Sequence, residues 1–494
     1  MNDTPVQIQF ALISHTNAGK TTLARTLIGI DLGEVRDAPH VTTLSESHTL
    51  LSSPSGDLLQ LWDTPGFGDS VRLFKRLCMS GNPIGWFLRE VVDRYRDRPF
   101  WLSQHAVRTA RDEADVVLYL VNSSEDPNDA GYLASEMKIL EWLAKPVVVL
   151  LNQMGPPRPF AHEQAEQIRW KEHLTVYPAV QEVIALDAFA RCWVHERVFY
   201  QAVGALIPAP KKDGYARLFR VWEQENGARF EAAMGLIAQQ IVNAARDSEP
   251  IEIASGALIG TVLKAIGLGQ RRDLKRQDKA MRLLMTRLND SVVATSAGLL
   301  KLYRLDPGAA AKINERVQQA FVVRAPLDAK QAGLLGAIIS GAATGLSADL
   351  LAGGLTFGAG ALVGGVLGAM TFAGAAWAFN ATTDRSEPTV QFSDDFLRSL
   401  IVVGLLRYLA VAHFGRGRGN FVEGEAPAFW QSEVESALAL NENALSGVWH
   451  SARAADAQDK AGAGAAAGAE AEAKLAAALS AMASLILAQL YPRP

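Results

Sequence analysis

One short run near the start of the chain combines the residue types that bind phosphate. It reads Ser-His-Thr-Asn-Ala-Gly-Lys-Thr from Ser14 to Thr21, after an apolar stretch and before a helical pattern. In such a loop the backbone N–H groups and the helix N-terminus face the β-phosphate, the lysine spans two phosphate groups, and the next hydroxyl binds Mg²⁺. Ser14 stands where the pattern has its first glycine. The run predicts a P-loop, and a chance loop of small residues is the alternative. The residues expected to bind nucleotide here are Asn17, Ala18, Gly19, Lys20, Thr21 and Thr22.

A second run supplies an acid and a glycine suited to phosphate chemistry. Asp63 to Asp69 reads Asp-Thr-Pro-Gly-Phe-Gly-Asp and follows the apolar stretch 58–62. An acid at such a strand end can hold Mg²⁺ through water, and Gly66 can turn its N–H toward the γ-phosphate. Alone the run could be a Pro-Gly turn with an ordinary acid, but beside a P-loop it predicts nucleotide hydrolysis.

Two adjacent threonines between these runs could complete the metal site. Thr42 and Thr43 lie in a polar segment, and a mobile loop here should bring one hydroxyl to the metal when γ-phosphate is present. We favour Thr43, and an ordinary loop or strand edge is the alternative. The expected catalytic residues are Lys20, Thr43 and Gly66, and the expected metal ligands are Thr21, Thr43 and Asp63.

The elements that must position these residues alternate between strands and helices. Apolar stretches at 7–14, 58–62, 116–121 and 147–151, with a weaker one at 183–186, are typical of buried strands, and helical patterns lie between several of them. This order predicts an α/β domain with a mostly parallel sheet, helices on both faces, and ligand loops at the carboxyl ends of the strands. After Pro208 the strand signal fades and helical periodicity dominates.

The phosphate-site residues resemble those of the TrmE–Era–septin class of GTPases. That class has Asn at the position of Asn17, paired threonines in its switch I loop, and Asp-Thr-Pro-Gly in its switch II segment, here 63–69. More narrowly, the chain is similar to bacterial predicted GTPases with an uncharacterised C-terminal domain. The runs that carry this likeness are Ser-Gly-Asn-Pro-Ile-Gly-Trp-Phe at 80–87, Asp-Arg-Pro-Phe-Trp at 97–101, Leu-Asn-Gln at 151–153, Asp-Ala-Phe at 187–189 and His-Phe-Gly-Arg-Gly-Arg-Gly at 413–419.

The resemblance has two consequences for catalysis. In potassium-activated members the P-loop Asn coordinates a monovalent cation, so Asn17 is expected to bind K⁺. Phe67 occupies the place where Ras-like enzymes have a water-orienting Gln, so intrinsic hydrolysis should be slow. Faster hydrolysis would need a cation, a nucleotide-dependent dimer partner or an outside group to place the water or to neutralise charge in the transition state.

The base site departs from the class. Guanine-specific members carry Asn-Lys-x-Asp after the strand that is 147–151 here, whereas this chain has Asn152-Gln153-Met154-Gly155. Asn152 can still reach the base or the P-loop, but the carboxylate that pairs with guanine is absent. Asp187 could supply one from the neighbouring loop, or it could cap the following helix. Guanine preference therefore stays open, with ATP as the alternative.

Composition changes along the chain predict its domain organisation. The GTPase domain is expected at 1–207, with a helical insertion at 72–110 that follows switch II and could contact an effector protein. The expected later regions are a helical region at 208–332, an apolar Gly/Ala-rich hairpin at 333–380, a helical region at 381–452, an Ala/Gly linker at 453–475 and a terminal helix at 476–494.

The apolar segment 333–380 suggests membrane association. Small residues four apart, such as Gly341 and Gly345, let helices approach closely in a bilayer, and the segment is long enough for two short paired helices. Basic residues crowd 271–287 and could face anionic lipid, although a solvated helix face explains them as well. A tightly packed soluble hairpin is the alternative. Arg416 and Arg418 could meet an anion or lie in a solvated turn.

Composition excludes some functions and leaves several open. With a net charge of −4 the chain has no global basic field, so nucleic acid is not an expected partner. Cys78 and Cys192 form no metal or disulfide pattern, and no signal peptide is recognisable, so we expect a cytoplasmic protein at the inner face of the membrane. The first hypothesis is a regulatory GTPase that switches a membrane-associated helical domain through Mg²⁺-dependent hydrolysis. The alternatives are a nucleotide-gated membrane scaffold with little hydrolysis, an ATP-preferring P-loop protein, and a structural protein with a vestigial site.

Overall fold

The structure, a computed structural model, divides the chain into two compact units. It describes residues 4–15, 18–29, 46–78, 93, 96–155, 157–188, 192–250, 268–305, 377–380, 389–414, 427–459 and 464–491. One unit is Met1–Ala228 with Ala412–Gly419, and the other is Arg229–Val411 with Asn420–Pro494. We call them the N-terminal unit and the C-terminal unit.

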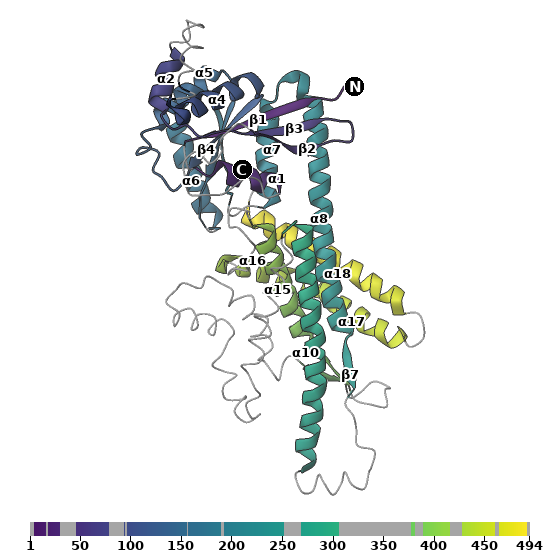
Figure 1. Ribbon diagram of the computed structural model, residues 1–494. Helices are drawn as coiled ribbons and strands as arrows, with labels where there is room; N and C mark the ends of the chain where they lie inside the picture. The colour runs from purple at the N-terminus through teal and green to yellow at the C-terminus, as the bar shows by residue number, and fades with distance from the viewer. Residues whose placement is uncertain are drawn as a thin grey trace. The chain divides into compact units, whose positions relative to one another are not determined.

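The N-terminal unit contains a six-stranded sheet with the strand order β2-β3-β1-β4-β5-β6. Strands β1, β2, β3 and β4 of this sheet are labelled in Figure 1. All neighbouring strands run parallel except the edge pair of β2 and β3. The predicted mostly parallel α/β domain is therefore confirmed. The strand β2 was not predicted, because its sequence Glu-Ser-His-Thr-Leu-Leu-Ser lacks an apolar run and it needs only one partner at the edge. The bounds are β1 Gln7–Ser14, β2 Glu46–Ser52, β3 Leu58–Asp63, β4 Val116–Asn122, β5 Val147–Asn152 and β6 Val180–Ala185.

Helices cover both faces of this sheet because its central strands are apolar on both sides. In β1, Ala11 and Ile13 belong to one buried cluster, whereas Phe10 and Leu12 belong to the other, as the two-residue period of a strand requires. The first cluster includes residues of α2 Ser70–Cys78, α4 Arg98–Glu113, α5 Leu133–Leu143 and α6 Phe160–Leu174. The second includes residues of α1 Lys20–Ile28, α7 Trp193–Leu206 and the start of α8 Lys212–Arg246.

The strand register brings the predicted motifs to one edge of the sheet. Leu12 lies beside Asp63, Ser14 beside Leu120, and Asn122 beside Asn152 in the parallel ladder. The P-loop, switch II and the loop after β5 therefore start at neighbouring carboxyl ends, where open α/β sheets bind ligands.

A buried ion pair fastens the start of α8 to the opposite edge. The Arg217 guanidinium donates to both carboxylate oxygens of Asp57, each at 2.7 Å, and the Val6 amide donates to the same carboxylate at 3.1 Å. The hydrogen bonds from Arg217 hold the pKa of Asp57 at about 2, below its ordinary value, although burial opposes them. The contact with α8 thus belongs to the core of the N-terminal unit.

The C-terminal unit is mainly helical, as the sequence predicts. The C-terminal half of α8 packs closely on α10 and α15. A Cβ atom added at Gly298 would lie 2.9 Å from Leu236, and one added at Gly404 would lie 2.7 Å from Ile237. Small residues at these helix crossings allow the backbones to approach. The remaining elements are α10 Leu268–Leu302, α15 Asp394–Ala412, α16 Ala428–Leu440, α17 Glu442–Asp459, α18 Gly464–Leu490 and a sheet of β7 Ser248–Pro250, β9 Thr389–Phe392 and β8 Trp377–Asn380.

The Ala/Gly linker expected at 453–475 is not found there. Helix α17 continues to Asp459 and α18 begins at Gly464, so most of this stretch is helical. Alanine has the highest helix propensity, and the pattern of buried residues Ala471, Leu475 and Leu479 packs one stripe of α18 into the core. The low content of large apolar residues in 453–475 thus belongs to helices that pack in the core, and the linker interpretation is wrong.

Among the described residues, Ala466–Leu490 is the one helix long and apolar enough to cross a membrane. It is partly buried against α16 and α17, and core helices of globular proteins pass the same test. The predicted apolar hairpin lies outside the described residues apart from 377–380, which form β8.

Candidate functional site

The glycine before Lys20 has a backbone conformation that L-amino acids with a side chain rarely adopt. Gly19 is the N-cap of α1 and has a φ of 89°, in the left-handed region. A Cβ atom at this position would lie 2.7 Å from Nδ2 of Asn152, which is too close. Glycine is therefore favoured here for two reasons, the left-handed φ and the closeness of Asn152 at the end of β5.

The lysine of the motif is buried and hydrogen-bonded within the loop. Lys20 Nζ donates to Ser14 Oγ at 2.7 Å, so the serine that replaces the first glycine provides the lysine with a partner. Burial lowers the pKa of Lys20 to about 8, and the negative charges of Asp63 and Glu136 oppose that shift. A triphosphate would add further negative charge next to this group.

The two described candidate metal ligands lie together. Thr21 Oγ1 donates to Asp63 Oδ2 at 2.9 Å, which joins the start of α1 to the end of β3. A hydroxyl and a carboxylate are the hard oxygen ligands that Mg²⁺ prefers. Thr22 occupies the next position of α1, whereas Asn17, Thr42 and Thr43 lie outside the described residues.

Switch II is bonded to the P-loop in this structure. The Phe67 amide donates to the Ser14 carbonyl at 2.9 Å, and Thr64 Oγ1 donates to the Leu12 carbonyl at 2.7 Å. The Phe67 side chain is fully buried in the cluster that contains Leu73 and Phe100. Although Phe67 matches the sequence position of a water-orienting Gln, its side chain is part of the core.

Asn152 joins the two sides of the candidate site. Its Nδ2 donates to the Ala18 carbonyl of the P-loop at 2.9 Å, and its Oδ1 accepts the Ala188 amide at 2.8 Å. The side chain is completely buried. Of the two roles considered for Asn152, the structure displays the bond to the P-loop.

Asp187 lies in the loop after β6, which neighbours the loop after β5 that contains Gly155. It is 4% exposed, and its Oδ2 accepts the Met154 amide at 2.6 Å. The alternative role as a helix cap is wrong, because α7 begins at Trp193 with Cys192 as its N-cap. Gly155 has a φ of 86°, and no atom lies within 4 Å of a Cβ built on it. The carboxylate from the next loop therefore stands beside a position with open space.

A buried polar network beside the P-loop was missed by the sequence reasoning. Glu136 is completely buried and accepts hydrogen bonds from Tyr119 OH at 2.5 Å and from His15 Nδ1 at 2.7 Å. Burial raises the pKa of Glu136, and the His15 contact opposes this. His15 also stacks on Tyr132 with ring centres 4.1 Å apart. The available signal was an acid on the apolar face of α5, next to Met137.

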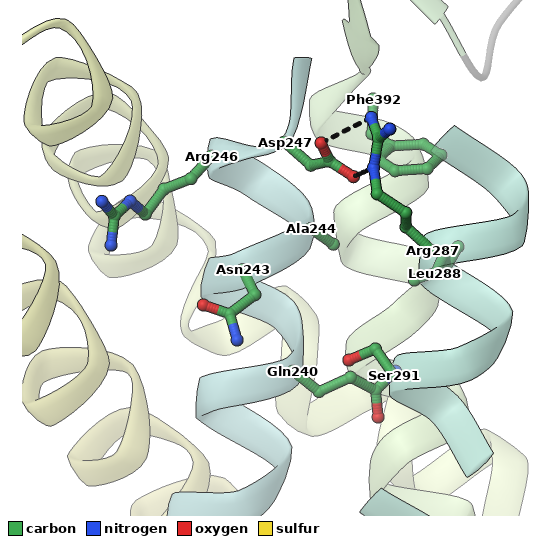
Figure 2. A pocket seen from close by; sticks show the side chains of 9 residues that line it. All are labelled: Gln240, Asn243, Ala244, Arg246, Asp247, Arg287, Leu288, Ser291 and Phe392. Atoms are coloured by element: carbon green, nitrogen blue, oxygen red, sulfur yellow. Dashed lines mark hydrogen bonds and ion pairs between the residues drawn. The ribbon is translucent and has the colours of Figure 1, made fainter. Parts of the chain in front are cut away.

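The C-terminal unit has a polar cavity of a different kind. Its volume is about 350 Å³, and it is lined by side chains of α8, α10 and β9 (Figure 2). Two of its charged side chains pair with each other, since Arg287 donates to both oxygens of Asp247 at 2.9 Å. No group of three or more metal-binding side chains occurs among the residues that the structure describes. Within the part of the chain that the structure describes, the groups needed for phosphate chemistry come together at the N-terminal site.

Two family profiles match the sequence, one over the N-terminal part and one over the later part. The family profile described as "50S ribosome-binding GTPase" matches residues 9–153. The profile described as "domain of unknown function (DUF3482)" matches residues 179–481, which is more than half of the chain. No curated protein matches the sequence.

Solved GTPase structures are similar to parts of the chain. Era in complex with MgGDPNP and a piece of 16S ribosomal RNA is 18% identical, and the match covers 42% of this chain and 58% of that one, with a TM-score of 0.31. A variant of Era from Aquifex aeolicus bound to GDP and AlF4⁻ is 16% identical, with coverage of 57% and 90% and a TM-score of 0.31. A small GTPase from Trypanosoma brucei is 13% identical, with coverage of 43% and 99% and a TM-score of 0.22.

Proposed function

The chain belongs to the DUF3482 family, and we propose that it is a regulatory GTPase whose nucleotide state switches the helical domain of that family. Its N-terminal domain is a P-loop GTPase of the TrmE–Era type, and it hydrolyses GTP. The observation that carries the proposal is the position of Lys20, Thr21 and Asp63 at one edge of the sheet, with Thr21 Oγ1 2.9 Å from Asp63 Oδ2. These groups fit the two phosphates and the metal of a bound GTP.

Mg²⁺ fits the donor set at this edge. Thr21 and Asp63 supply a hydroxyl and a carboxylate, and Thr43 stays a predicted third ligand. Bound there, Mg²⁺ would neutralise charge on the β- and γ-phosphates, while Lys20 would contact the same phosphates. K⁺ binding by Asn17 stays a prediction from the resemblance.

Hydrolysis should be slow without help. Gly66 would direct its N–H to the γ-phosphate, but the side chain of Phe67 packs in the core and has no group that could orient water. The attacking water would therefore depend on backbone groups, a cation or a partner protein. A nucleotide-dependent dimer is one such partner.

Asp187 is the best candidate for recognising guanine. Guanine offers two adjacent donors, N1–H and the 2-amino group, and a carboxylate accepts both. Asp187 is held at the loop that contains Gly155 by its bond to the Met154 amide, and Asn152 connects the adjoining Ala188 to the P-loop. Its negative charge also contributes to the raised pKa of Glu163, for which burial is the main cause. Asp187, from the loop after β6, would thus accept the guanine hydrogen bonds for which the loop after β5 has no carboxylate.

Single-turnover hydrolysis of GTP and ATP, in Na⁺ and then in K⁺, tests the proposal. We expect turnover of GTP that is faster in K⁺, and GTP binding that is weaker by about 100-fold or more after Lys20→Ala. Tight GTP binding without turnover would favour the nucleotide-gated scaffold. Turnover by the Lys20→Ala variant equal to that of the native protein would contradict the proposed site.

The effector side of the proposal concerns the C-terminal domain. We propose that 333–380 associates with the cytoplasmic face of a membrane, for which its Gly and Ala spacing is the support. Flotation of the full chain with vesicles of anionic lipid, compared with a variant lacking 333–380, would test this. Retention of both proteins in the soluble fraction would rule out membrane association, and equal flotation would point to another segment such as α18.

A further inference from the structure

One hydroxyl outside the GTPase motifs contacts switch II at two points. Ser103 Oγ, on α4, accepts the Gly68 amide at 3.1 Å and donates to the Gly66 carbonyl at 3.3 Å. The side chain is completely buried. Because a hydroxyl can donate one hydrogen bond and accept others, a single side chain can hold both peptide groups at once.

The residue between these two glycines is fixed as well. Phe67 packs its side chain in the cluster that contains Phe100 of α4, and its amide donates to the Ser14 carbonyl at 2.9 Å. Three successive residues of switch II are therefore attached to α4 on one side and to the P-loop on the other. The backbone around Gly66 has little freedom while Ser103 holds it.

Helix α2, which follows switch II, is attached to the same region. Arg72 pairs with Asp97 and lies over the Phe100 ring at 3.9 Å, while Arg76 pairs with Asp93. Residues before and at the start of α4 thus hold α2 as Ser103 holds switch II. A movement of switch II should therefore be transmitted to α4 through the Ser103 hydrogen bonds and through the ion pairs of α2.

We propose that Ser103 is a positioning residue that holds Gly66 beside the P-loop, where its N–H can meet the γ-phosphate, and so makes α4 sensitive to GTP. The inference rests on the proposed function of Gly66. GDP has no γ-phosphate, so Ser103 should matter for GTP and not for GDP. A residue needed only for folding would affect the two nucleotides equally.

The test measures the affinities of the full chain for a non-hydrolysable GTP analogue and for GDP. Ser103→Ala should weaken binding of the analogue by about five- to tenfold and change GDP affinity by less than about twofold, since two modest hydrogen bonds are lost. Ser103→Cys keeps the size but is a poor hydrogen-bonding partner, so it should give the same loss. Hydrogen exchange at the Gly68 amide should speed up in both variants.

A matched control comes from the same helix. Thr109 is also buried on α4, and its Oγ1 bonds to His105 Nδ1 at 3.3 Å. Thr109→Val should leave the ratio of GTP-analogue to GDP affinity unchanged. An equal loss for both nucleotides in Ser103→Ala, or an unchanged ratio in both Ser103 variants, would overturn the inference. If the native protein binds no GTP, the proposed function fails and the inference fails with it.

Discussion

The two halves of the nucleotide site are built in different ways. The proposed phosphate half consists of Lys20, Thr21, Asp63 and Gly66, which all stand at positions of the sequence motifs, and Thr21 bonds to Asp63. In the proposed base half, formed by Asn152 and Asp187, the carboxylate would come from the loop after β6 instead of the loop after β5. Phosphate binding depends on backbone geometry and one fixed loop, whereas base recognition needs only a suitable acceptor at the right place. The residue that recognises the base can therefore change its place in the sequence more easily than the residues that bind phosphate.

The largest expected effect is on the phosphate half. Lys20→Ala removes a buried cation that would contact the phosphates of a bound nucleotide, so we expect affinity for GTP and GDP to fall by about 100-fold or more. Isothermal titration calorimetry would measure it, with the exposed Lys138→Ala on α5 as a control that keeps normal affinity. If Lys20→Ala weakened the binding of GTP but not that of other nucleoside triphosphates, the separation into a phosphate half and a base half would be contradicted.

Asn152→Ala should damage both halves at once. It leaves the Ala18 carbonyl and the Ala188 amide without the bonds that they have in the structure, and each buried unsatisfied group costs about 1 to 3 kcal/mol. We expect affinity for GTP to fall roughly tenfold to 100-fold and the melting temperature to drop. Binding and thermal unfolding of the same samples would show whether the two losses occur together. Normal affinity in a destabilised variant would mean that Asn152 is only structural.

Much of the phosphate half could be read from the sequence because its motifs are continuous. Lys20 and Thr21 follow the loop after β1, and Asp63 ends β3. Because β1 and β3 are parallel neighbours, these residues meet at the same edge of the sheet. Glu136 and Ser103 could not be found in this way, since each lies on a helix and its role depends on which side of that helix faces the site. Strand β2 and the helical stretch at 453–475 were missed because edge pairing and alanine propensity leave little apolar pattern.

Ser14→Gly should have a small effect that is the same for every base. It removes the hydroxyl that accepts the bond from Lys20 Nζ and restores the glycine usual at this position. The lysine would then lose a competing partner, so affinity for GTP should rise by less than about fivefold. ATP and GTP titrations in parallel would check this. If Ser14→Gly changed the affinities for ATP and GTP by different factors, Ser14 would couple the phosphate half to the base half.

Asp57→Asn should change neither half, although it should destabilise the domain. The buried carboxylate pairs with Arg217, and breaking such a pair costs about 3 kcal/mol of unfolding free energy. Its pKa of about 2 in the folded protein lies below its ordinary value, so the stabilisation is complete at neutral pH and is lost as pH falls through about 2. Urea unfolding of both proteins should show a difference in stability that shrinks below about pH 4. A constant difference down to pH 2, or altered GTP affinity at pH 7, would contradict this prediction.

The most direct test of the account is a nucleotide panel on Asp187→Asn. Asparagine keeps an oxygen that can accept the Met154 amide, so the fold should remain. Xanthine has a carbonyl where guanine has its 2-amino group, and an amide offers one acceptor and one donor to match it. We predict that the native chain prefers GTP over XTP and ATP, and that Asp187→Asn loses GTP affinity by roughly 100-fold while it gains affinity for XTP. The exposed Asp129→Asn should behave as the native chain does. Unchanged GTP preference in Asp187→Asn would contradict the claim that the loop after β6 recognises the base.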